Sequence, residues 1–483
     1  MNEQITAFID CYVKEIANDN AAIFAGAGFS WDAGFVNWQE LLEGIAKEIG
    51  LDSSKESNLV ALAQYHCNKY NRSRINTTIF NAFSSNREID ENHRILARLP
   101  IFTYWTTNYD SLIEDALRAE KKVVDVKRKD NDLCLVSAGR DAVVYKMHGD
   151  KDSPDDAIII KDDYESYYKK HSSFLTALSG DLLSKTFLFL GFSFSDPNID
   201  YVLSRLRVEN GSNNQRQHYA IMRNVKRTEF KSKADYTYAK CKQDLIIDDM
   251  RRRYNITVLL VDDYSEITEI LRSIEKKLFR NNIFISGSAK EFGAFTETEA
   301  QEFITTLSSR LVKKGYNIIS GFGLGVGSSV ITGALKEIYS ISNATIKNDK
   351  LILRPFPQDI QDQDMRKKLF TQYREDMISR AGISVFVFGN RTRKDDHDQV
   401  ENAYGVVEEF EIAKKFNNLI VPVGCTGWVA KEIWEDVNKN FQQYYPGSDG
   451  QLLNCFKKLD QKTDPDKLAT AVIEFIDKIS LGS

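Results

Sequence analysis

Cysteine is scarce in this chain, and its six copies are scattered rather than clustered. No two of them are separated by only two residues, which excludes the usual four-cysteine zinc module. The same scatter argues against a disulfide framework and is typical of reduced thiols in a cytoplasmic protein. We therefore expect a cytoplasmic chain that holds no metal ion.

Long apolar runs and a strong excess of one charge are also missing. The longest apolar stretches, at residues 186–192 and 383–388, are strand-length and far shorter than the roughly 18 residues of a membrane-spanning helix. The N-terminal stretch contains acidic residues and no small-residue cleavage site, which argues against a secretory signal. With 64 Lys and Arg against 69 Asp and Glu, the net charge of -5 favours neither a nucleic-acid nor a membrane partner.

The chain is too long for one ordinary core, because its 483 residues exceed the usual size of a domain. Apolar strands followed by glycine turns and helical patterns begin near Ala21 and begin again at Asn282. Such alternation predicts an α/β fold with parallel sheets flanked by helices. No Pro- or Ser-rich linker intervenes, so we expect two Rossmann-like domains in contact, in residues 1–280 and 281–483.

Polar loops follow four predicted strands of the first half. They contain the glycines of residues 24–30, then Asn108 and Asp110, then His148, and finally the polar run of residues 191–198. In an open parallel sheet, ligands bind beyond the carboxyl ends of the strands, and glycines let the backbone approach a pyrophosphate. Each loop alone leaves a structural role open, and Asp110 could instead cap the helix that follows it.

Together these loops resemble the sirtuin NAD-binding domain. The sequences GAGFS at 26–30, TTNYD at 106–110, HG at 148–149 and LGFSFSDPN at 190–198 occur in the order of that family. Sirtuin deacetylases usually carry a four-cysteine zinc module, and this chain has none, so the resemblance implies the group that hydrolyses NAD⁺. The residues that we expect to bind NAD⁺ are Ala25, Gly26, Ala27, Gly28, Ser30, Thr107, Asp110, Gly191, Ser193 and Asp196.

Asn108 and His148 are the candidate catalytic residues, from their chemistry and from the resemblance. Cleavage of the nicotinamide–ribose bond passes through an oxocarbenium-like state, as glycoside cleavage does. Nicotinamide leaves as a neutral pyridine, so the site must position the ribose and orient or deprotonate a nucleophile. The Asn108 amide suits holding ribose hydroxyls or a water, and the His148 imidazole suits general-base work near neutral pH. NAD⁺ is then the substrate, and no resident cofactor is expected.

The second half repeats the layout of strands that end in glycine turns, at Gly287 and in the glycine series of residues 321–327. That series runs into a helix and favours an anion-binding cradle, although a tight turn alone stays possible. The segment resembles a SLOG domain, in which we expect Glu409 to bind ribose hydroxyls and arginines to bind phosphate. The predicted ligand-binding residues are Ser286, Gly287, Ser288, Gly321, Gly323, Leu324, Gly325, Gly327, Arg374, Arg391, Gly405 and Glu409.

A sirtuin-like domain followed by a SLOG domain resembles the NAD-hydrolysing effectors of the Thoeris anti-phage defence system. The resemblance implies that the second domain binds a cyclic ADP-ribose isomer made by a TIR-domain partner. Binding would switch on NAD⁺ cleavage, which requires tighter binding to the active arrangement than to the resting one. The resemblance also implies a homotetramer. A non-catalytic nucleotide-binding regulator and, less favoured, an NAD-dependent deacylase are the alternatives.

Overall fold

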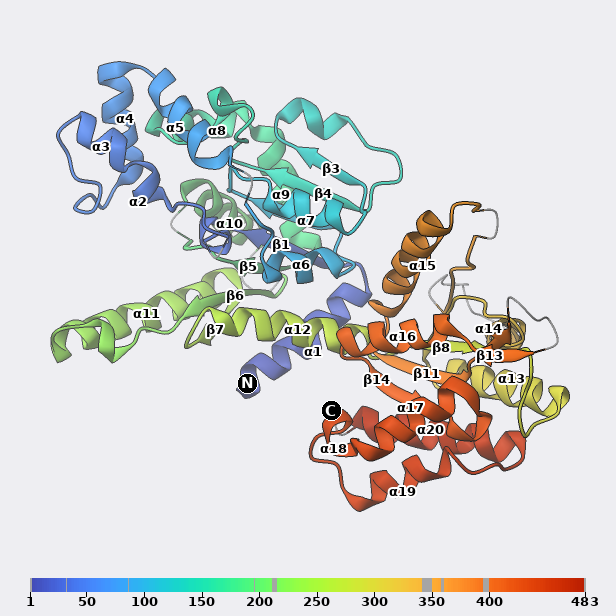
Figure 1. The fold of residues 1–483 in the computed structure, drawn as a ribbon. Helices are drawn as coiled ribbons and strands as arrows, with labels where there is room; N and C mark the ends of the chain where they lie inside the picture. The colour runs from blue at the N-terminus through green and yellow to red at the C-terminus, as the bar shows by residue number, and fades with distance from the viewer. Residues whose placement is uncertain are drawn as a thin grey trace. The chain divides into compact units, whose positions relative to one another are not determined.

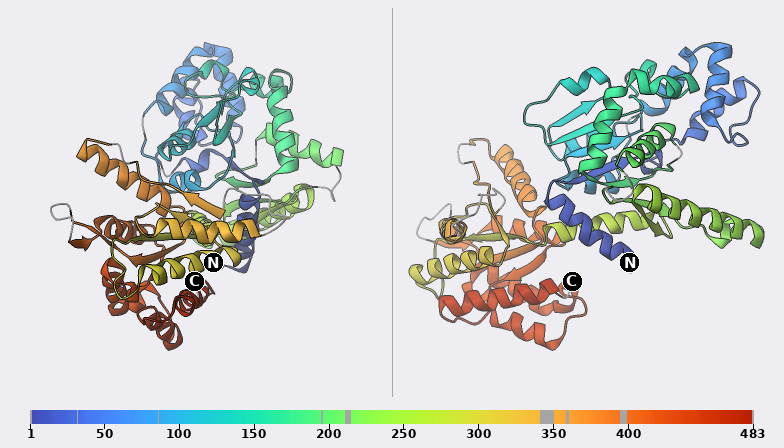
Figure 2. Two further views of the ribbon diagram at one scale, coloured as in Figure 1. Left: turned by 90° about the vertical axis from the view of Figure 1, so that its right-hand side faces the viewer. Right: turned by 180° about the vertical axis from the view of Figure 1, so that it is seen from behind.

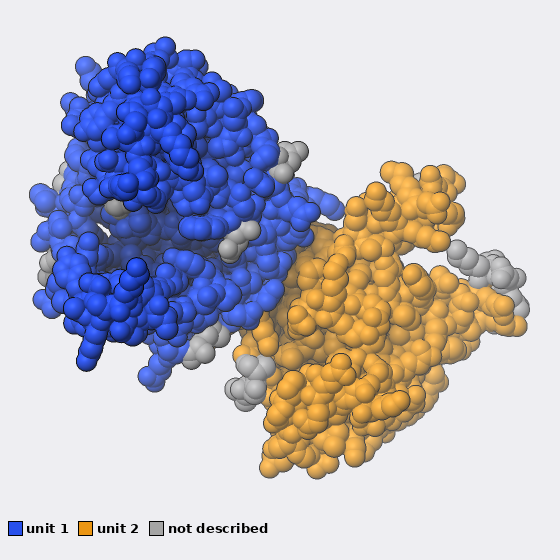
Figure 3. Space-filling view, turned by 60° about the vertical axis from the view of Figure 1, so that its left-hand side comes forward, with its two compact units in different colours: residues 1–275 blue, residues 276–483 orange. Residues whose placement is uncertain are grey.

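The computed structural model describes residues 2–31, 33–85, 87–194, 196–210, 215–340, 350–357, 360–393 and 399–481. The chain divides into two compact units, residues 1–275 and 276–483, which Figure 3 shows in different colours. Within the described residues, no helix combines the length and the apolar character needed to cross a membrane.

The first unit is built on a seven-stranded sheet in which every strand pairing is parallel. All residues of its central strands β1 and β5 are buried, as expected for a parallel sheet covered on both faces. In their order across the sheet, the strands are β3 (Val124–Lys127), β4 (Ala142–Lys146), β2 (Thr103–Thr106), β1 (Ala21–Ala25), β5 (Thr186–Leu190), β6 (His218–Arg223) and β7 (Ile256–Val261).

Helices cover both faces of this sheet (Figures 1 and 2). Helix α6 packs on α7, and α10 packs on α8, α9 and α11, which gives two separate groups. The helices are α1 (Glu3–Ala17), α6 (Glu91–Arg98), α7 (Leu112–Ala119), α8 (Lys161–Lys170), α9 (Ser172–Ser184), α10 (Pro197–Asn210), α11 (Lys233–Tyr254) and α12 (Ser265–Phe279).

A separate helical layer is inserted between β1 and β2. It has its own apolar core, which includes Leu42, Leu62, Ile75 and Ile79 and reaches Ile159 after β4. This layer lies beside the loops at the carboxyl edge of the sheet, because the same core takes in Tyr109. Its helices are α2 (Trp38–Leu41), α3 (Glu43–Glu48), α4 (Leu59–Tyr70) and α5 (Ser73–Phe83).

The second unit contains a five-stranded parallel sheet and a two-stranded antiparallel hairpin. The larger sheet has the order of a doubly wound fold, with its switch in chain direction between β8 and β11. Its strands are β10 (Leu351–Leu353), β9 (Asn317–Ser320), β8 (Asn282–Ser288), β11 (Ile383–Phe388) and β14 (Leu419–Pro422), and the hairpin is β12 (Asn390–Thr392) with β13 (Val400–Asn402).

One continuous apolar core joins this sheet to its helices. Helix α13 packs on α14 and α20, whereas α15 packs on α16, so two helical groups enclose the sheet. The two α/β units with parallel sheets confirm the predicted fold class. The helices are α13 (Glu297–Lys313), α14 (Gly327–Ser340), α15 (Gln363–Ile378), α16 (Tyr404–Lys415), α17 (Trp428–Lys439), α18 (Phe441–Tyr444), α19 (Gly450–Lys458) and α20 (Pro465–Leu481).

The close approach of β1 and β5 at their carboxyl ends predicts a large cost for any side chain at Gly191. A Cβ atom there would lie 2.1 Å from the backbone nitrogen of Phe29, and the φ angle of Gly191 is +60°. We expect Gly191→Ala to lower the free energy of unfolding by at least about 2 kcal/mol in urea titrations. Gly180→Ala is the control, because nothing lies within 4 Å of its Cβ position in α9 and alanine favours a helix. Equal stability of the two variants would contradict this account.

Candidate functional site

Four strands of the first sheet end at one level. Ala25 pairs with Thr106 on one side and Leu190 on the other, and Thr106 pairs with Lys146. Asn108 and His148 each lie two residues beyond their paired strand ends, on strands that are neighbours in the sheet. Because adjacent strands lie roughly 4.8 Å apart, parallel pairing brings the two backbones together at the same edge.

The glycines at this edge allow two loops to touch backbone to backbone. Gly26 N donates to Leu190 O at 2.9 Å, and Gly28 N donates to Gly191 O at 3.0 Å. These N–H groups are therefore used within the protein, and the glycines have a packing reason that is independent of any phosphate. A short 3₁₀ turn, Ala27–Phe29, follows β1, and the first α-helix after it begins only at Trp38. The N-terminus of this helix is therefore eight residues beyond Ser30, and the glycine loop itself does not lead directly into an α-helix.

The Asn108 side chain is buried, and only its amide nitrogen has hydrogen-bond partners among the described residues. Its Nδ2 donates to Gly26 O at 3.1 Å and to Ser30 Oγ at 3.0 Å. Its Oδ1 is buried and has no hydrogen-bond partner among the described residues. A buried acceptor left unpaired costs about 1–3 kcal/mol, so this oxygen is suited to accept a hydrogen bond from a ligand.

A small cavity of about 20 Å³ lies beside Asn108, between the strand-end loops and the inserted helical layer. Its volume suits a water molecule rather than a nucleoside, so NAD⁺ needs a wider opening than this arrangement offers. Asn108, Thr107, Asp110 and Ser30 line it, whereas His148 is not among its lining residues. The other lining residues are Ala27, Phe35, Val36, Trp38, Leu41, Phe83 and Tyr109.

Asp110 supports the loop from within. Its Oδ1 accepts from Leu112 N at 3.0 Å, at the start of α7. Asp110 is not the N-cap of this helix, which is Ser111, but its carboxylate supports the first residue of α7 and also lines the cavity.

His148 is buried and faces a carboxylate. Its Nε2 lies 3.2 Å from Asp196 Oδ2, an ion-pair distance whose angle is not that of a hydrogen bond. Both ring nitrogens consequently lack a hydrogen-bond partner among the described residues. The ring packs edge-on against Tyr164, with 5.6 Å between ring centroids. Ser193 of the same loop as Asp196 is exposed.

The pKa of the Asp196 carboxyl is lowered. Burial raises this pKa, but the electrostatic interaction with His148 and hydrogen bonds from the backbone N–H groups of Ile199 and Asn198 outweigh that effect. The two backbone bonds to Asp196 Oδ1 measure 3.2 and 2.9 Å. Asp196 is therefore held as a carboxylate next to the imidazole.

Sequence reasoning missed Lys146, the last residue of β4. Its side chain is fully buried, and its ammonium contacts the loops that follow both β2 and β4. The signal was available, because a lysine that ends an apolar strand just before His148 must either reach solvent or find buried partners.

In the second unit, four of the predicted ligand-binding residues meet: Ser286, Arg374, Gly405 and Glu409. Ser286 Oγ donates to Glu409 Oε2 at 2.5 Å, and Arg374 Nε lies 3.4 Å from Glu409 Oε1. Gly405 leaves room for this arginine, since a Cβ there would lie 2.6 Å from Arg374 Nη2. Burial raises the pKa of the Glu409 carboxyl, although Arg374 and Ser286 act in the opposite direction.

Arg374 has further partners that fix its position. Its Nη1 lies 2.7 Å from Glu408 Oε2, and its guanidinium stacks over the Phe356 ring, 5.0 Å from the centroid. Only 11% of the side chain is exposed. An anionic ligand would therefore have to compete with two carboxylates for this guanidinium.

The sequence predicts the glycines of this unit in turns beyond the strands and in a loop that binds an anion, and the structure gives them different surroundings. Ser286, Gly287 and Ser288 are the last residues of strand β8 and not a turn beyond it. In the loop after β9, a Cβ on Gly323 would lie 2.0 Å from Gly287 O, and one on Gly325 would lie 2.1 Å from Ala289 O. These glycines let the loop pack against the end of β8, which accounts for them without a bound anion.

The flanking glycines are similarly crowded, and Leu324 is exposed. Cβ atoms on Gly321 and Gly327 would lie 2.8 Å from the Phe356 ring and 2.7 Å from Phe322 Cα. Leu324 at the tip of the loop is 64% exposed and its carbonyl accepts from Ala289 N. The loop thus presents an apolar side chain at the carboxyl edge of the sheet.

Arg391 lies apart from the Arg374 group in its contacts. It is on strand β12 and its Nη2 lies 2.8 Å from Glu401 Oε1, across the hairpin. In the described part of the chain this is its one ion pair. Sequence reasoning missed its neighbour Asn390, whose buried amide oxygen accepts from the N–H groups of Lys290 and Glu291 and holds the loop after β8.

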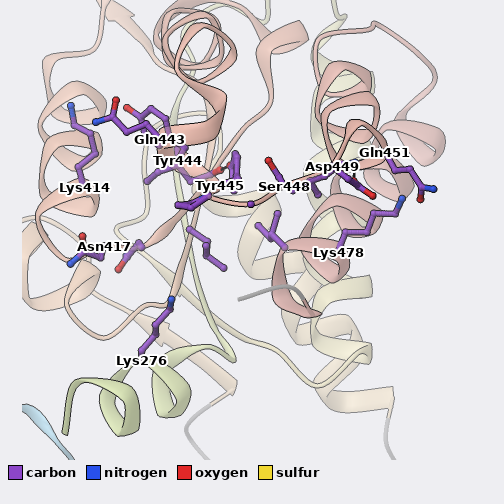
Figure 4. Close-up of a pocket in the computed structure, with 17 residues that line it drawn as sticks. Lys276, Lys414, Asn417, Gln443, Tyr444, Tyr445, Ser448, Asp449, Gln451 and Lys478 are labelled. Atoms are coloured by element: carbon purple, nitrogen blue, oxygen red, sulfur yellow. Dashed lines mark hydrogen bonds between the residues drawn. The ribbon is translucent and has the colours of Figure 1, made fainter. Parts of the chain in front are cut away.

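A larger cavity, of about 1000 Å³, lies at the opposite edge of this sheet, before the first residue of β14 (Figure 4). Lys276, Lys414 and Lys478 line it, from three different helices, and Figure 4 shows their ammonium groups well apart. None of the predicted ligand-binding residues lines this cavity. Over the described residues, no group of three or more His, Cys, Asp or Glu side chains is placed to hold a metal ion.

Comparison with known proteins matches each half of the chain to a domain family. The SIR2-like domain family matches residues 103–246, and the Sir2- and TIR-associating SLOG family matches residues 266–479. The chain is 49% identical to NAD(+) hydrolase ThsA of Bacillus cereus (strain MSX-D12), with 99% of each chain covered. It is 46% identical to NAD(+) hydrolase ThsA of Acinetobacter baumannii (strain 532279), over 97% of this chain and 98% of that one. The chain belongs to the ThsA family.

Family membership confirms the sirtuin-like and SLOG domains that the motifs predicted. A further relative, NAD(+) hydrolase ThsA of Cytobacillus dafuensis, is 45% identical over 98% of this chain and 96% of its own. The roles assigned to individual site residues stay predictions, supported by the geometry described above.

The lowered pKa of Asp196 predicts a pH-dependent cost for Asp196→Asn. A carboxyl whose folded pKa lies below its unfolded value of about 3.9 stabilises the fold above that pH, and this stabilisation is lost as the pH falls through the folded pKa. We expect the variant to be less stable by about 1–3 kcal/mol at pH 7, with the difference shrinking below about pH 4.

Urea titrations of parent and variant at several pH values measure this difference. Asp248→Asn is the control, because Asp248 forms an exposed pair with Arg252 on α11 and should change stability little at any pH. A loss in Asp196→Asn that is the same at pH 7 and pH 3 would contradict a carboxylate stabilised by its surroundings.

Proposed function

We propose that this chain is an NAD⁺ hydrolase whose first unit cleaves the nicotinamide–ribose bond to give nicotinamide and ADP-ribose. A cyclic ADP-ribose isomer, made by a TIR-domain partner, binds in the second unit and activates the cleavage. Depletion of NAD⁺ then serves anti-phage defence, and the working form is a homotetramer in the cytoplasm. The curated relatives that carry the name NAD(+) hydrolase support the reaction, and the Sir2- and TIR-associating SLOG family supports the partner.

The observation that carries the catalytic proposal is the buried Oδ1 of Asn108 beside a cavity, for which the described part of the chain offers no hydrogen-bond partner. This oxygen can accept a hydrogen bond from a ribose hydroxyl or from the attacking water, while Nδ2 remains bonded to Gly26 and Ser30. The amide is thus held in one orientation by the protein and offers its oxygen to the substrate.

The pair of His148 and Asp196 suits general-base catalysis. The water oxygen bonds to the anomeric carbon, nicotinamide leaves with the electron pair of the broken bond, and a ring nitrogen of His148 takes the water proton. Nε2 faces the Asp196 carboxylate at 3.2 Å, so the carboxylate stabilises the imidazolium that forms. Nδ1 has no hydrogen-bond partner within the described residues and is the nitrogen that we assign to proton transfer.

The Ser286, Glu409 and Arg374 group supports ligand binding in the second unit. Glu409 can accept hydrogen bonds from ribose hydroxyls, and Arg374 can pair with a phosphate. A bound phosphate would replace Glu408 or Glu409 as the partner of Arg374, which changes how α15 is held against α16. Exchange of ion-pair partners is a way for ligand binding to favour one arrangement of the unit.

Removal of either catalytic side chain should stop nicotinamide release. We expect Asn108→Ala and His148→Ala each to lower kcat by at least about 100-fold, because each removes a group that acts on the reacting atoms. Nicotinamide release from NAD⁺, with a cyclic ADP-ribose isomer present, is the measurement. His171→Ala is the control, since His171 pairs with Asp130 away from the four loops. Parent-like turnover in either catalytic variant would refute its assignment.

Loss of the guanidinium at position 374 should weaken activation. We expect Arg374→Met to raise the concentration of cyclic ADP-ribose isomer needed for half-maximal activity by at least about tenfold, because a charge-assisted phosphate contact is lost. Arg354→Met is the matched control. The Arg354 side chain is half-exposed, and its ion pair with Asp376, at 3.5 Å, lies outside the group formed by Arg374, Glu408 and Glu409. If both variants respond like the parent across the titration, the effector site lies elsewhere.

A further inference from the structure

Lys146 is the only lysine among the largest fully buried side chains of the described residues, with no exposed surface. It stands at the end of β4, two residues before His148. An isolated ammonium in such a place would be strongly destabilising, so the protein must supply partners that compensate for its loss of hydration. The identity of those partners shows what the residue holds together.

The ammonium spans two loops. On one side, Nζ donates to Asp110 O and, at 3.4 Å, to Tyr109 O, in the loop that carries Asn108. On the other side, it lies 2.8 Å from Asp150 Oδ2, in the loop that carries His148. Lys146 therefore links the segments directly behind both candidate catalytic residues.

Carboxylates and a second cation surround Lys146. Its Nζ donates to Glu114 Oε1 at 3.1 Å, in the first turn of α7. Asp150 Oδ2 is also 3.2 Å from Arg128 Nε, and the Asp110 carboxyl group acts electrostatically on Lys146 as well. Glu114 and Asp150 are each 1% exposed, so this group is a buried ion network and not a surface pair.

The network also fixes the backbone of the His148 loop. Asp150 Oδ1 accepts from Asp152 N at 2.9 Å, and Lys151 N donates to Tyr109 O at 3.1 Å. The backbone of one loop is thus bonded to the other, and the ammonium sits at the same junction. Lys146 itself does not line the cavity beside Asn108, so it is not placed to touch a substrate there.

We infer that Lys146 is a positioning residue, which sets the placement of Asn108 relative to His148 by joining the two loops behind them. The inference rests on the proposed function, because it needs both residues to act on one substrate. Loss of the ammonium should leave NAD⁺ binding nearly intact and slow the chemical step, since misplacement by about 1 Å can cost roughly 100-fold in rate.

The test compares kcat and KM for nicotinamide release in folded variants. Lys146→Met keeps the length of the side chain, and the triple variant Lys146→Met, Glu114→Gln, Asp150→Asn also removes the carboxylates that would be left unpaired. We expect both to lower kcat by at least about 30-fold while KM for NAD⁺ changes by less than about threefold. A merely structural role would lower the midpoint of thermal unfolding and the active fraction without this split.

Lys127→Met is the matched control. Lys127 is also buried at the end of a strand of this sheet, next to Lys146's strand, but it pairs with Asp125 and with Leu135 O rather than with either loop. We expect it to lower stability and leave kcat per folded molecule unchanged. A similar fall of kcat in Lys127→Met would overturn the inference, because the effect would then follow from any buried lysine.

The remaining outcomes separate this inference from the proposed function. If Asn108→Ala is inactive and the triple variant turns over like the parent, the proposed function stands and the positioning role of Lys146 is wrong. If Asn108→Ala and His148→Ala retain activity, the proposed active site is wrong, and the positioning role of Lys146 falls with it. Should neither Lys146 variant fold, Asp150→Asn decides, because it removes the negative charge that pairs with Lys146 and keeps an oxygen that can accept from Asp152 N. Parent-like kcat there overturns the inference, and a fall of at least about tenfold at unchanged KM supports it.

Discussion

The register of parallel pairing is the constraint on which the candidate active site depends. Strands β4, β2, β1 and β5 are neighbours, and their last residues pair directly with one another. Four loops that are far apart in the sequence therefore start from one level of one edge. Because side chains alternate between the faces of a strand, a slip of one residue would move Asn108 or His148 out of this arrangement. Glycine at the β1–β5 junction then permits the close backbone contact that completes the edge.

Buried charge is the second theme, and both units use it in the same way. Lys146 joins two loops in the first unit, and Arg374 joins α15 to α16 through Glu408 and Glu409 in the second. Buried ion networks contribute little net stability compared with well-packed apolar groups, but breaking one is costly. Such networks hold loops and helices in one arrangement, and a ligand that brings its own charge can rearrange them. The first network lies behind the candidate catalytic residues, whereas the second includes residues that we assign to ligand binding.

Much of this organisation could be predicted from the sequence, because it follows from local patterns. Apolar runs of strand length, glycine turns and helical periodicity predicted two α/β units with parallel sheets, and the order of four motifs predicted the sirtuin-like half. The packing of the helices between β1 and β2 into a layer with its own core was not anticipated, because that core includes residues such as Ile159 that are distant in the sequence. The role of glycines 321 to 327 in packing the loop on β8 was also beyond reach, because it depends on backbone atoms distant in the sequence.

By itself the sequence determined which chemistry is available at which strand end: an amide at position 108, an imidazole at 148, and carboxylates and a guanidinium in the second half. Only the tertiary structure decided which of these groups have partners. Within the described residues the Asn108 oxygen has no hydrogen-bond partner, His148 faces Asp196, and Lys146 is enclosed by partners from three segments. The physical reason is that residue type and spacing act along the chain, whereas burial, hydrogen-bond satisfaction and charge balance arise from atoms brought together across it.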